Sequence, residues 1–469
     1  MSKAKIVVTL GPASDSVETV KALMLAGAGI FRMNASHGAW ADHERRIGVV
    51  RQAEAELGCT AAILLDLQGP KIRLGKFETG KIQLITGQRF TISTVRTLGN
   101  NQKASTSYTA FAHDVRPGDR VLLNDGAVTL KALENDGTEV LFEVMQGGPA
   151  GDNKGINLPG VKVSAPSMTE KDIEDLKCGL AAGIDFVALS FVRRGADVRA
   201  LRELMGDAKV PIVAKIEKPE ALEDIDEILR ESNGIMVARG DLGVEMSLEA
   251  VPPIQKMLIR KARKQNRFVI TATQMLESMI ENANPTRAEI SDVANAIYDG
   301  TDAVMLSAET SVGKYPVEAV AYMARTAAEA EKGIVRRGFS EKGLISGGSD
   351  SEVVADAAYN AAKNANVQAI VVFTQMGYSA RLISRYHPPV RIIAMTDSQT
   401  VMRRLLMNYG VEPVMAPAVQ TTDDMLEQMN SMLVERGYLR PGDKVVFVAG
   451  QPVGRSGSTN LMKLHRVTG

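Results

Sequence analysis

The chain has 469 residues, and its 55 basic side chains balance 55 acidic ones, so the formal net charge is zero. A chain of this length is expected to form about two to four domains. Hydrophobic residues make up 45% and charged residues 23% of the chain, which is a globular composition and argues against wholesale disorder. The charge balance and the 4% aromatic content argue against a nucleic-acid-binding protein, which needs a basic surface and stacking side chains.

The cysteines and the N-terminal segment indicate a cellular compartment. Cys59 and Cys178 cannot form a disulfide framework, which fits a reducing environment. The apolar segment that follows Lys5 is too short for a signal peptide or a membrane span, and no long uncharged apolar run follows it. We therefore expect a soluble cytoplasmic protein without a membrane partner.

Short runs rich in β-branched residues recur along the chain, and each is followed by a stretch with helical character. Continuous apolar strands that alternate with helices are typical of βα units around a buried parallel sheet. Eight such units predict a (β/α)₈ TIM barrel. The predicted strands are Lys5–Leu10, Gly29–Asn34, Ala62–Leu67, Asp185–Phe191, Pro211–Glu217, Gly234–Arg239, Phe268–Thr273 and Ala303–Ser307.

The long stretch between the third and fourth predicted strands has a different character. The runs Lys81–Thr91, Arg120–Leu130 and Thr138–Met145 read as strands, with turn sequences at 116–119 and 135–137. They predict a small all-β domain inserted into the barrel. Its two connections, near Gly69-Pro70 and Ala165-Pro166, make it a candidate lid that excludes water from the site.

A third unit is expected at the C-terminal end. The glycine- and serine-rich segment Lys342–Asp350 reads as a linker. The predicted helix Val353–Asn364 and the predicted strands Ala369–Thr374, Arg391–Thr396 and Lys444–Ala449 then indicate an α/β domain. We predict a catalytic barrel over 1–70 and 166–342, an inserted lid over 71–165, and a C-terminal regulatory domain over 343–469.

Charged and polar residues stand at successive ends of the predicted barrel strands. In a (β/α)₈ barrel, the carboxyl ends of the strands form the active site. Any one of these residues could be an ordinary loop or surface side chain, but their recurrence favours an active site. They are Arg32, Asn34, Ser36 and His37 where the second strand ends, Asp66 and then Arg73 where the third ends, Lys215 and Glu217 at the end of the fifth, Gly240 and Asp241 where the sixth ends, Thr273 at the end of the seventh, and Ser307 and Glu309 where the eighth ends.

In their order and spacing, these segments resemble the pyruvate kinase family over essentially the whole chain. The resemblance implies phosphoryl transfer from phosphoenolpyruvate to ADP, giving pyruvate and ATP in glycolysis, by a homotetramer. The matching segments are Arg32–Gly38, Leu65–Arg73, Asn153–Gly160, Lys215–Glu217, Met236–Glu245, Thr271–Met279, Pro285–Glu289 and Asp299–Glu309.

The residue types fit phosphoryl transfer, which depends chiefly on positioning and charge stabilisation. Alternation along a strand puts Lys215 and Glu217 on one face, toward the barrel mouth. Glu217 and Asp241 offer hard oxygen ligands for Mg²⁺ or Mn²⁺, and the resemblance implies that this ion bridges the enolate and phosphate of the substrate. The charge of Lys215 would stabilise the transferring phosphoryl group and the developing enolate.

Other strand-end residues are expected to contact the substrates. Arg32 is a fork donor for phosphate oxygens, and the backbone at Gly240 opens a helix whose N–H groups would hold the substrate carboxylate. Thr273 and Ser307 would belong to the hydroxyl and water relay that protonates the enolate. The resemblance assigns further residues to the nucleotide side: Asn34, His37, Arg73 and Lys154, with Pro12 near the adenine.

Three residues near the site are expected to be structural. In the family, the residue that matches Arg239 is usually the partner of a carboxylate. Met275 and Met279 have helical spacing, which favours a place in the core.

The sequence departs from the family's commoner pattern after the third strand. Those members read Asp-Thr-Lys-Gly-Pro-Glu-Ile-Arg and hold a potassium ion, whereas residues 66–73 here read Asp-Leu-Gln-Gly-Pro-Lys-Ile-Arg. We hypothesise that the ammonium of Lys71 supplies the ion's charge, so that K⁺ is not required. The resemblance places the monovalent ion at Asn34, Ser36, Asp66 and Leu67.

The predicted C-terminal domain carries a candidate anion-binding loop. A strand, a glycine-bearing hydroxyl-rich loop and a helix start form a phosphate nest. Family members bind a phosphorylated activator there, with a second loop that corresponds to Arg455–Asn460. A sugar phosphate or nucleotide is therefore expected to act allosterically, its identity left open. The loop residues are Thr374, Gln375, Gly377, Tyr378 and Ser379.

Two other functions compete with this interpretation. A barrel lyase or aldolase would form a Schiff base on Lys215, but Glu217 works against the lowered pKa that such a lysine needs. A catalytically silent metabolite-binding homologue would typically lack the lysine or the metal carboxylates, yet Lys215, Glu217, Asp241 and Thr273 are all present.

Overall fold

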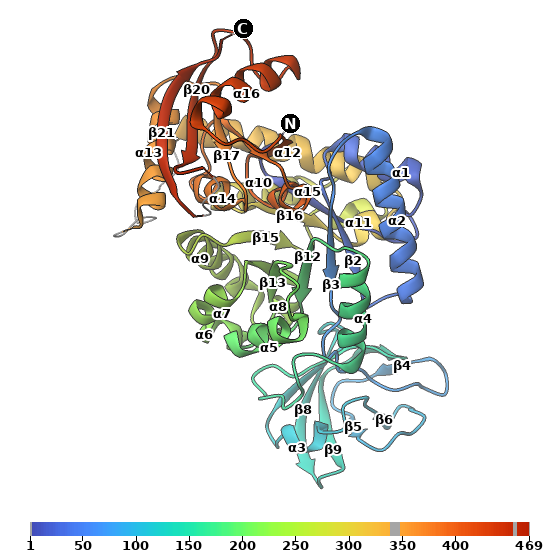
Figure 1. Ribbon diagram of the computed structural model, residues 1–469. Helices are drawn as coiled ribbons and strands as arrows, with labels where there is room; N and C mark the ends of the chain where they lie inside the picture. The colour runs from blue at the N-terminus through green and yellow to red at the C-terminus, as the bar shows by residue number, and fades with distance from the viewer. Residues whose placement is uncertain (1, 338–347, 454–456, 469) are drawn as a thin grey trace.

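The computed structural model describes residues 2–337, 348–453 and 457–468. Figure 1 shows a central barrel with a β-rich unit beyond one end and an α/β unit beyond the other. Residues 342–347 of the predicted linker and residues 455–456 of the predicted second effector loop lie outside the described residues. In the part of the chain that is described, no helix has the length and apolarity needed to cross a bilayer.

Eight parallel strands close into a barrel, so the predicted (β/α)₈ fold class is confirmed. Successive side chains of each strand point to opposite faces, and both faces are buried. Val7, for example, points into a core inside the barrel, while Ile6 and Val8 pack against the surrounding helices. This double burial explains why the strands read as continuous apolar runs. In their order around the barrel, they are β1 (Lys5–Thr9), β2 (Ile30–Asn34), β3 (Ala62–Asp66), β12 (Phe186–Leu189), β13 (Ile212–Ile216), β14 (Gly234–Ala238), β15 (Phe268–Ala272) and β16 (Ala303–Leu306).

Helices surround the barrel strands (Figure 1). Several begin with a capping box, in which a threonine such as Thr169 or Thr286 satisfies free N–H groups of the first turn. The helices are α1 (Val17–Ala26), α2 (Trp40–Leu57), α4 (Glu170–Ala181), α5 (Gly195–Met205), α6 (Pro219–Glu223), α7 (Ile225–Glu231), α8 (Arg239–Glu245), α9 (Val251–Lys264), α10 (Arg287–Asp299), α11 (Ala308–Ser311) and α12 (Pro316–Arg337), with 3₁₀ turns at Leu248–Ala250 and Glu277–Ile280.

The segment between β3 and α4 forms a separate β unit with its own apolar core, as expected for an inserted all-β domain. Two of its predicted strands were wrong, because each contains a reversal of the chain. Asn124, Asp125 and Gly126 all have positive φ and turn the chain between β7 and β8, and Gly87 does so between β4 and β5. The elements are β4 (Lys81–Leu84), β5 (Arg89–Ser93), β6 (Lys103–Ser105), α3 (Phe111–Asp114), β7 (Arg120–Leu123), β8 (Val128–Asn135), β9 (Glu139–Gln146), β10 (Gly148–Gly151) and β11 (Ile156–Asn157).

The C-terminal unit is a five-stranded sheet in the order β19-β18-β17-β20-β21. The sequence prediction missed its two edge strands. They carry residues that weaken a strand prediction, such as Pro413, which cannot donate to a strand ladder, and the charged Lys463. The elements are α13 (Asp350–Asn364), β17 (Ala369–Phe373), α14 (Tyr378–Ser384), β18 (Arg391–Thr396), α15 (Gln399–Leu405), β19 (Val411–Met415), α16 (Thr422–Glu435), β20 (Lys444–Gly450) and β21 (Thr459–Arg466).

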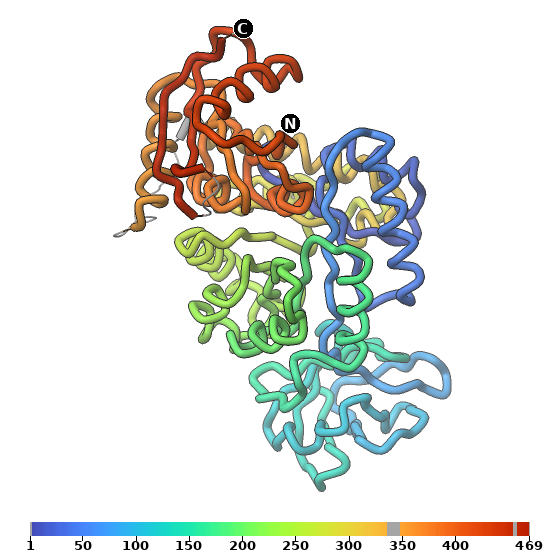
Figure 2. The backbone as a smooth tube through the Cα atoms, viewed as in Figure 1, coloured from blue at the N-terminus to red at the C-terminus, as the bar shows by residue number. Residues whose placement is uncertain are grey.

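The N-terminal segment ties the barrel to the C-terminal unit, and Figure 2 shows the two side by side. The N–H of Gly410 donates to the carbonyl of Lys3 at 2.8 Å, and the Lys5 ammonium donates to the Val411 carbonyl at 2.6 Å. These contacts lie at the amino ends of the barrel strands. The C-terminal unit therefore docks on the face opposite the lid and the barrel mouth.

Candidate active site

Lys215 lies at the centre of a buried charge cluster at the barrel mouth. Its Nζ is 2.8 Å from Oε1 of Glu217 and 3.3 Å from Oδ1 of Asp66. The other Asp66 oxygen accepts a 2.7 Å bond from Nε of Arg32, whose Nη1 also donates to Thr9 at 3.0 Å. Strands β2, β3 and β13 thus bring together residues that are far apart in the sequence, as the strand-end pattern predicted.

The protonation states of this cluster follow from burial and pairing. Burial acts to lower the pKa of Lys215, but the carboxylates of Asp66 and Glu217 outweigh it and raise that pKa, so the ammonium stays charged. Burial alone would raise the pKa of Asp66, yet the charges of Lys215 and Arg32 hold it below its ordinary value. Burial raises the pKa of Glu217 against the opposing effect of Lys215.

The sequence analysis missed Ser190 and Phe191, which support this cluster from the loop after β12. Oγ of Ser190 accepts a 2.7 Å bond from Lys215 and donates to the carbonyl of Leu67 at 2.7 Å. The backbone N–H of Phe191, a residue with φ of 54°, donates to Oε2 of Glu217 at 2.7 Å. A non-glycine residue at positive φ is a sign of a constrained site, but the sequence around Ser190 carries no such signal.

Glu217 and Asp241 are suited to a divalent cation. Asp241 lies in the first turn of α8, and its negative charge acts on both Lys215 and Glu217. In the described part of the chain, no three acidic, histidine or cysteine side chains converge as a ready-made metal cage. Two carboxylates without a cage fit Mg²⁺, which keeps several waters and binds substrate oxygens.

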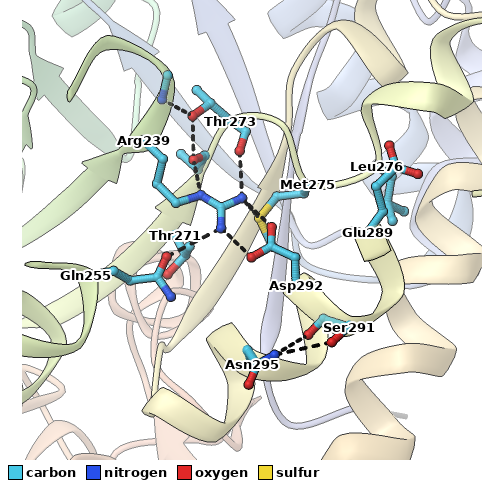
Figure 3. Close-up of polar contacts among 12 residues, drawn as sticks. Arg239, Gln255, Thr271, Thr273, Met275, Leu276, Glu289, Ser291, Asp292 and Asn295 are labelled. Carbon is cyan, nitrogen blue, oxygen red and sulfur yellow. Dashed lines mark hydrogen bonds and ion pairs between the residues drawn. The ribbon is translucent and has the colours of Figure 1, made fainter. Parts of the chain in front are cut away.

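Thr273 is fixed in a left-handed conformation with φ of 69°, beside Gly240. Its hydroxyl accepts a 2.7 Å bond from the Gly240 N–H and donates to the Ala272 carbonyl at 2.6 Å. The Arg239 guanidinium donates to the carbonyls of Ala272 and Thr273 and pairs with Asp292 at 2.7 Å (Figure 3). Arg239 is therefore a structural partner of a carboxylate, as expected.

The next residues along the chain are largely structural. Met275 and Met279 are fully buried in the main core, as their spacing predicted. Glu309 accepts from the backbone N–H of Ser307 at 2.7 Å and from that of Leu276 at 3.1 Å. This carboxylate fixes the backbone of Ser307, the residue that directly follows β16.

The predicted nucleotide-side residues come from two places. Asn34 is the last residue of β2 and His37 lies in the turn that follows it, where Oδ1 of Asn34 accepts from the N–H of Ser36 at 3.1 Å. Arg73 and Lys154 lie on paired segments at the base of the lid, since the N–H of Leu74 donates to the Lys154 carbonyl at 2.8 Å and Arg73 bridges Gly155. Pro12 follows β1 and is exposed.

Positive charge gathers on this side of the mouth. Burial lowers the pKa of His37, and the charges of Lys71, Arg73 and Arg32 lower it further. The Lys71 charge therefore acts at the turn that carries Asn34 and His37. At the predicted monovalent-cation position, Leu67 is buried and its side chain has no oxygen that could bind an ion. The Asp66 carboxylate forms ion pairs with Arg32 and Lys215.

The predicted effector loop lines a cavity of about 90 Å³ in the C-terminal unit. The chain enters it from β17, turns at Gly377 with φ of 77°, and continues into α14. Residues 457–459 of the second predicted loop line the same cavity. The lining from the first loop includes Thr374, Gln375, Tyr378 and Ser379.

A closed (β/α)₈ barrel with a charged lysine between buried carboxylates at its mouth is the framework of a barrel enzyme. The family model for the pyruvate kinase barrel domain matches residues 1–320, and that for the pyruvate kinase alpha/beta domain matches residues 352–465. The chain belongs to the pyruvate kinase family. It is accordingly a phosphotransferase, as predicted.

Individual relatives agree with the family match. The chain is 46% identical to a pyruvate kinase of Geobacillus stearothermophilus over 99% of this chain and 80% of that protein. It is also 46% identical to a pyruvate kinase of Mycobacterium intracellulare, over 99% and 98% of the two chains. A crystal structure of a pyruvate kinase from Cryptosporidium parvum superposes with a TM-score of 0.92 at 36% identity, over 99% and 96%.

Proposed function

We propose that this enzyme transfers the phosphoryl group of phosphoenolpyruvate to ADP, giving pyruvate and ATP. The observation that carries the proposal is the buried Lys215 ammonium, held 2.8 Å from Glu217 and 3.3 Å from Asp66 at the barrel mouth. A fixed cation in a site of low dielectric stabilises the charge that develops on the transferring phosphoryl group and the enolate. Arg32 adds a guanidinium for the phosphate oxygens.

The metal and substrate carboxylate belong on the opposite side of Lys215. Glu217 and Asp241 would hold Mg²⁺ or Mn²⁺, which supplies positive charge to the reacting oxygens when bound. The substrate carboxylate would bind at the start of α8. There it would accept the hydrogen bond that the Gly240 N–H otherwise donates to the Thr273 hydroxyl. Thr273 and Ser307 then serve the relay that delivers a proton to the enolate.

On the nucleotide side, Asn34, His37, Arg73 and Lys154 would bind ADP, with Pro12 near the adenine. Arg73 and Lys154 lie on paired segments at the base of the lid, so closure of the lid would bring both cations over the phosphates. This links nucleotide binding to the exclusion of water.

We propose that the enzyme does not require potassium. It would belong to the subgroup of the family that has a lysine at the position of Lys71, where other members have a glutamate. The monovalent-cation position at Asn34, Ser36, Asp66 and Leu67 lacks one side-chain oxygen, because Leu67 replaces a threonine. Both Asp66 oxygens also face cations. Burial is the main cause of the lowered pKa of His37, and the added charge of Lys71 lowers that pKa further, so it acts on the same turn.

The effector loop supports allosteric activation by a phosphorylated metabolite. Hydroxyl-bearing residues of the loop line a cavity to which residues 457–459 also contribute, and Gly377, with φ of 77°, turns the chain between them. Backbone N–H groups in such a turn form an anion nest. We further propose that the enzyme is a cytoplasmic homotetramer. Each subunit would consist of a catalytic barrel over 1–70 and 166–342, a lid over 71–165 and a regulatory domain over 343–469.

A lactate-dehydrogenase-coupled assay with phosphoenolpyruvate, ADP and Mg²⁺ tests the main proposal. Turnover that disappears without either substrate or the divalent cation is the expected result. No turnover by a folded protein would favour the silent metabolite-binding homologue. A panel of phosphorylated metabolites that leaves the phosphoenolpyruvate saturation curve unmoved would contradict the effector proposal.

The same site disfavours the lyase or aldolase alternative. A Schiff-base lysine needs a lowered pKa, whereas Asp66 and Glu217 raise the pKa of Lys215. Borohydride treatment with a keto acid is expected to leave the protein unlabelled, and covalent capture at Lys215 would overturn this assignment.

A further inference from the structure

A carboxylate outside the Lys215 charge cluster joins the lid to the barrel. Glu245 is the last residue of α8, and only 1% of its side chain is exposed. The Asn157 amide donates to its Oε1 at 3.0 Å, and the Lys218 ammonium lies 2.5 Å from the same oxygen. Asn157 belongs to β11 of the lid, and Lys218 directly precedes α6 of the barrel. Three segments of the chain therefore meet at one carboxylate oxygen.

The burial of Glu245 makes this contact strong. A carboxylate that is removed from water is costly unless a cation and hydrogen-bond donors compensate it. Lys218 supplies the cation, and Asn157 supplies a neutral donor from the lid. A hydrogen bond to an ionised acceptor is about twice as strong as one between neutral groups. Glu245 therefore holds the lid by a bond whose loss would leave a buried acceptor short of a donor.

The lid end of this contact belongs to the segment that carries the proposed nucleotide cations. Lys154 lies three residues before Asn157, and its carbonyl accepts from the N–H of Leu74 at 2.8 Å. Arg73 bridges Gly155 on the same pair of segments. Because backbone bonds hold the two segments together, a displacement of Asn157 would displace both Arg73 and Lys154.

The barrel end of the contact belongs to the proposed metal side. Helix α8 ends at Glu245 and carries Asp241, one proposed metal ligand, in its first turn. Lys218 directly follows Glu217, the other proposed metal ligand, and neighbouring side chains of an extended segment point to opposite faces. The Glu245 carboxylate thus connects the metal side of the site with the nucleotide side.

We infer, on the basis of the proposed transfer from phosphoenolpyruvate to ADP, that Glu245 is a positioning residue for the nucleotide. Through Asn157, its carboxylate fixes the base of the lid against α8 and so holds Arg73 and Lys154 in place for the nucleotide phosphates. Glu245 itself touches neither substrate. Groups that are ordered before binding lose less freedom when the ligand arrives, so the contact favours the affinity for ADP.

Exchanging the two partners tests this role. Asn157→Asp has nearly the same shape but places a second carboxylate against Glu245, and the two negative charges repel. KM for ADP should therefore rise by about tenfold or more, the loss expected for a hydrogen bond to a charged group, while KM for phosphoenolpyruvate changes little. The double variant Asn157→Asp/Glu245→Gln again pairs one carboxylate with one amide and should recover most of the ADP affinity.

Two exposed positions provide matched controls. Asn101→Asp adds a carboxylate elsewhere on the lid, and Glu249→Gln removes one from the 3₁₀ turn after α8. Both control variants should keep the wild-type KM for ADP. A variant that only loses folded protein would show a lower apparent kcat with both KM values unchanged. That result for Asn157→Asp would indicate a structural role and overturn the positioning role of Glu245.

Calorimetry of ADP binding to the full-length protein with Mg²⁺ separates this role from the reaction itself. An active wild type whose ADP dissociation constant is unchanged in Asn157→Asp would overturn the role of Glu245 and leave phosphoryl transfer intact. Equal losses in the single and double variants would also overturn it, because the exchange would then restore nothing. A wild type without turnover would instead contradict the proposed function.

Discussion

The ammonium of Lys215 and the carboxylate of Glu217 lie 2.8 Å apart at the mouth of the barrel, where Lys215 is near the end of β13 and Glu217 directly follows that strand. Side chains at positions i and i+2 of an extended segment point the same way, so the end of β13 and the residue after it deliver both charges to one place. The proposed phosphoryl-stabilising cation and the proposed metal ligand therefore hold each other in position before substrate arrives.

Replacing Lys215 with methionine tests the cation directly. Lys215→Met should lower turnover by about 10³-fold or more, because it removes a charge that acts on the transition state. The coupled assay measures this, with the exposed Lys209→Met as the control. A modest loss, with the metal dependence unchanged, would contradict the role of Lys215.

Ser190 is predicted to position Lys215 without touching substrate. Ser190→Ala removes the 2.7 Å bond to the Lys215 ammonium, so kcat should fall about tenfold while KM for phosphoenolpyruvate changes little. Ser190→Thr keeps the hydroxyl and should recover part of the rate. A raised KM with unchanged kcat would instead indicate a binding role.

Arg239 holds the backbone that bears Thr273, and Figure 3 shows its guanidinium between Thr273 and Asp292. Arg239→Lys retains the charge but cannot span two carbonyls and a carboxylate, so kcat should fall by about 10–100-fold. Asp292→Asn should give a smaller loss, since the carbonyl contacts remain. Steady-state kinetics on both variants provide the comparison. A kcat of Arg239→Lys equal to that of the wild type would contradict the positioning role of Arg239.

Lys71 is predicted to replace the monovalent ion. In a potassium-free buffer balanced with tetramethylammonium, the wild type should be active and respond little to added K⁺. The double variant Leu67→Thr/Lys71→Glu restores the commoner pattern and should depend on K⁺ for activity. Lys76→Glu, at an exposed lid position, serves as the charge control. Strong stimulation of the wild type by K⁺ would contradict the prediction that Lys71 replaces the monovalent ion.

His387 should make stability fall in mild acid. Burial lowers the pKa of His387 from its ordinary 6.5 to about 4, so the unfolded chain binds a proton that the folded chain does not. Stability then rises with pH between about 4 and 6.5. Across this pH range, the lowered pKa of His387 changes the free energy of unfolding by roughly 3 kcal/mol, at about 1.4 kcal/mol per pKa unit.

The comparison with His387→Gln isolates this contribution. The variant should unfold in denaturant with less dependence on pH across the same window, whatever its absolute stability. The ring stacks on Tyr409 at 3.7 Å, so some stability is lost at every pH. Identical pH slopes for the two proteins would contradict the lowered pKa.

The barrel and the polar residues at its strand ends follow from local patterns in the chain. Strand periodicity is a local property, and it located all eight barrel strands together with Arg32, Lys215, Glu217 and Thr273 at their ends. The failures were also local in origin. The left-handed turn at Asn124–Gly126 lies inside an apolar run, and the edge strands of the C-terminal sheet lack a continuous apolar pattern.

Which of these groups meet depends on how the strands and units pack together. Closure of the barrel places Asp66 against both Arg32 and Lys215, and brings the hydroxyl of Ser190 to the same ammonium. Docking of the C-terminal unit likewise gathers Arg267 and Arg381 around one cavity. Pairing across elements depends on register and on docking, which bring together residues more than a hundred positions apart, and no local pattern encodes such distances.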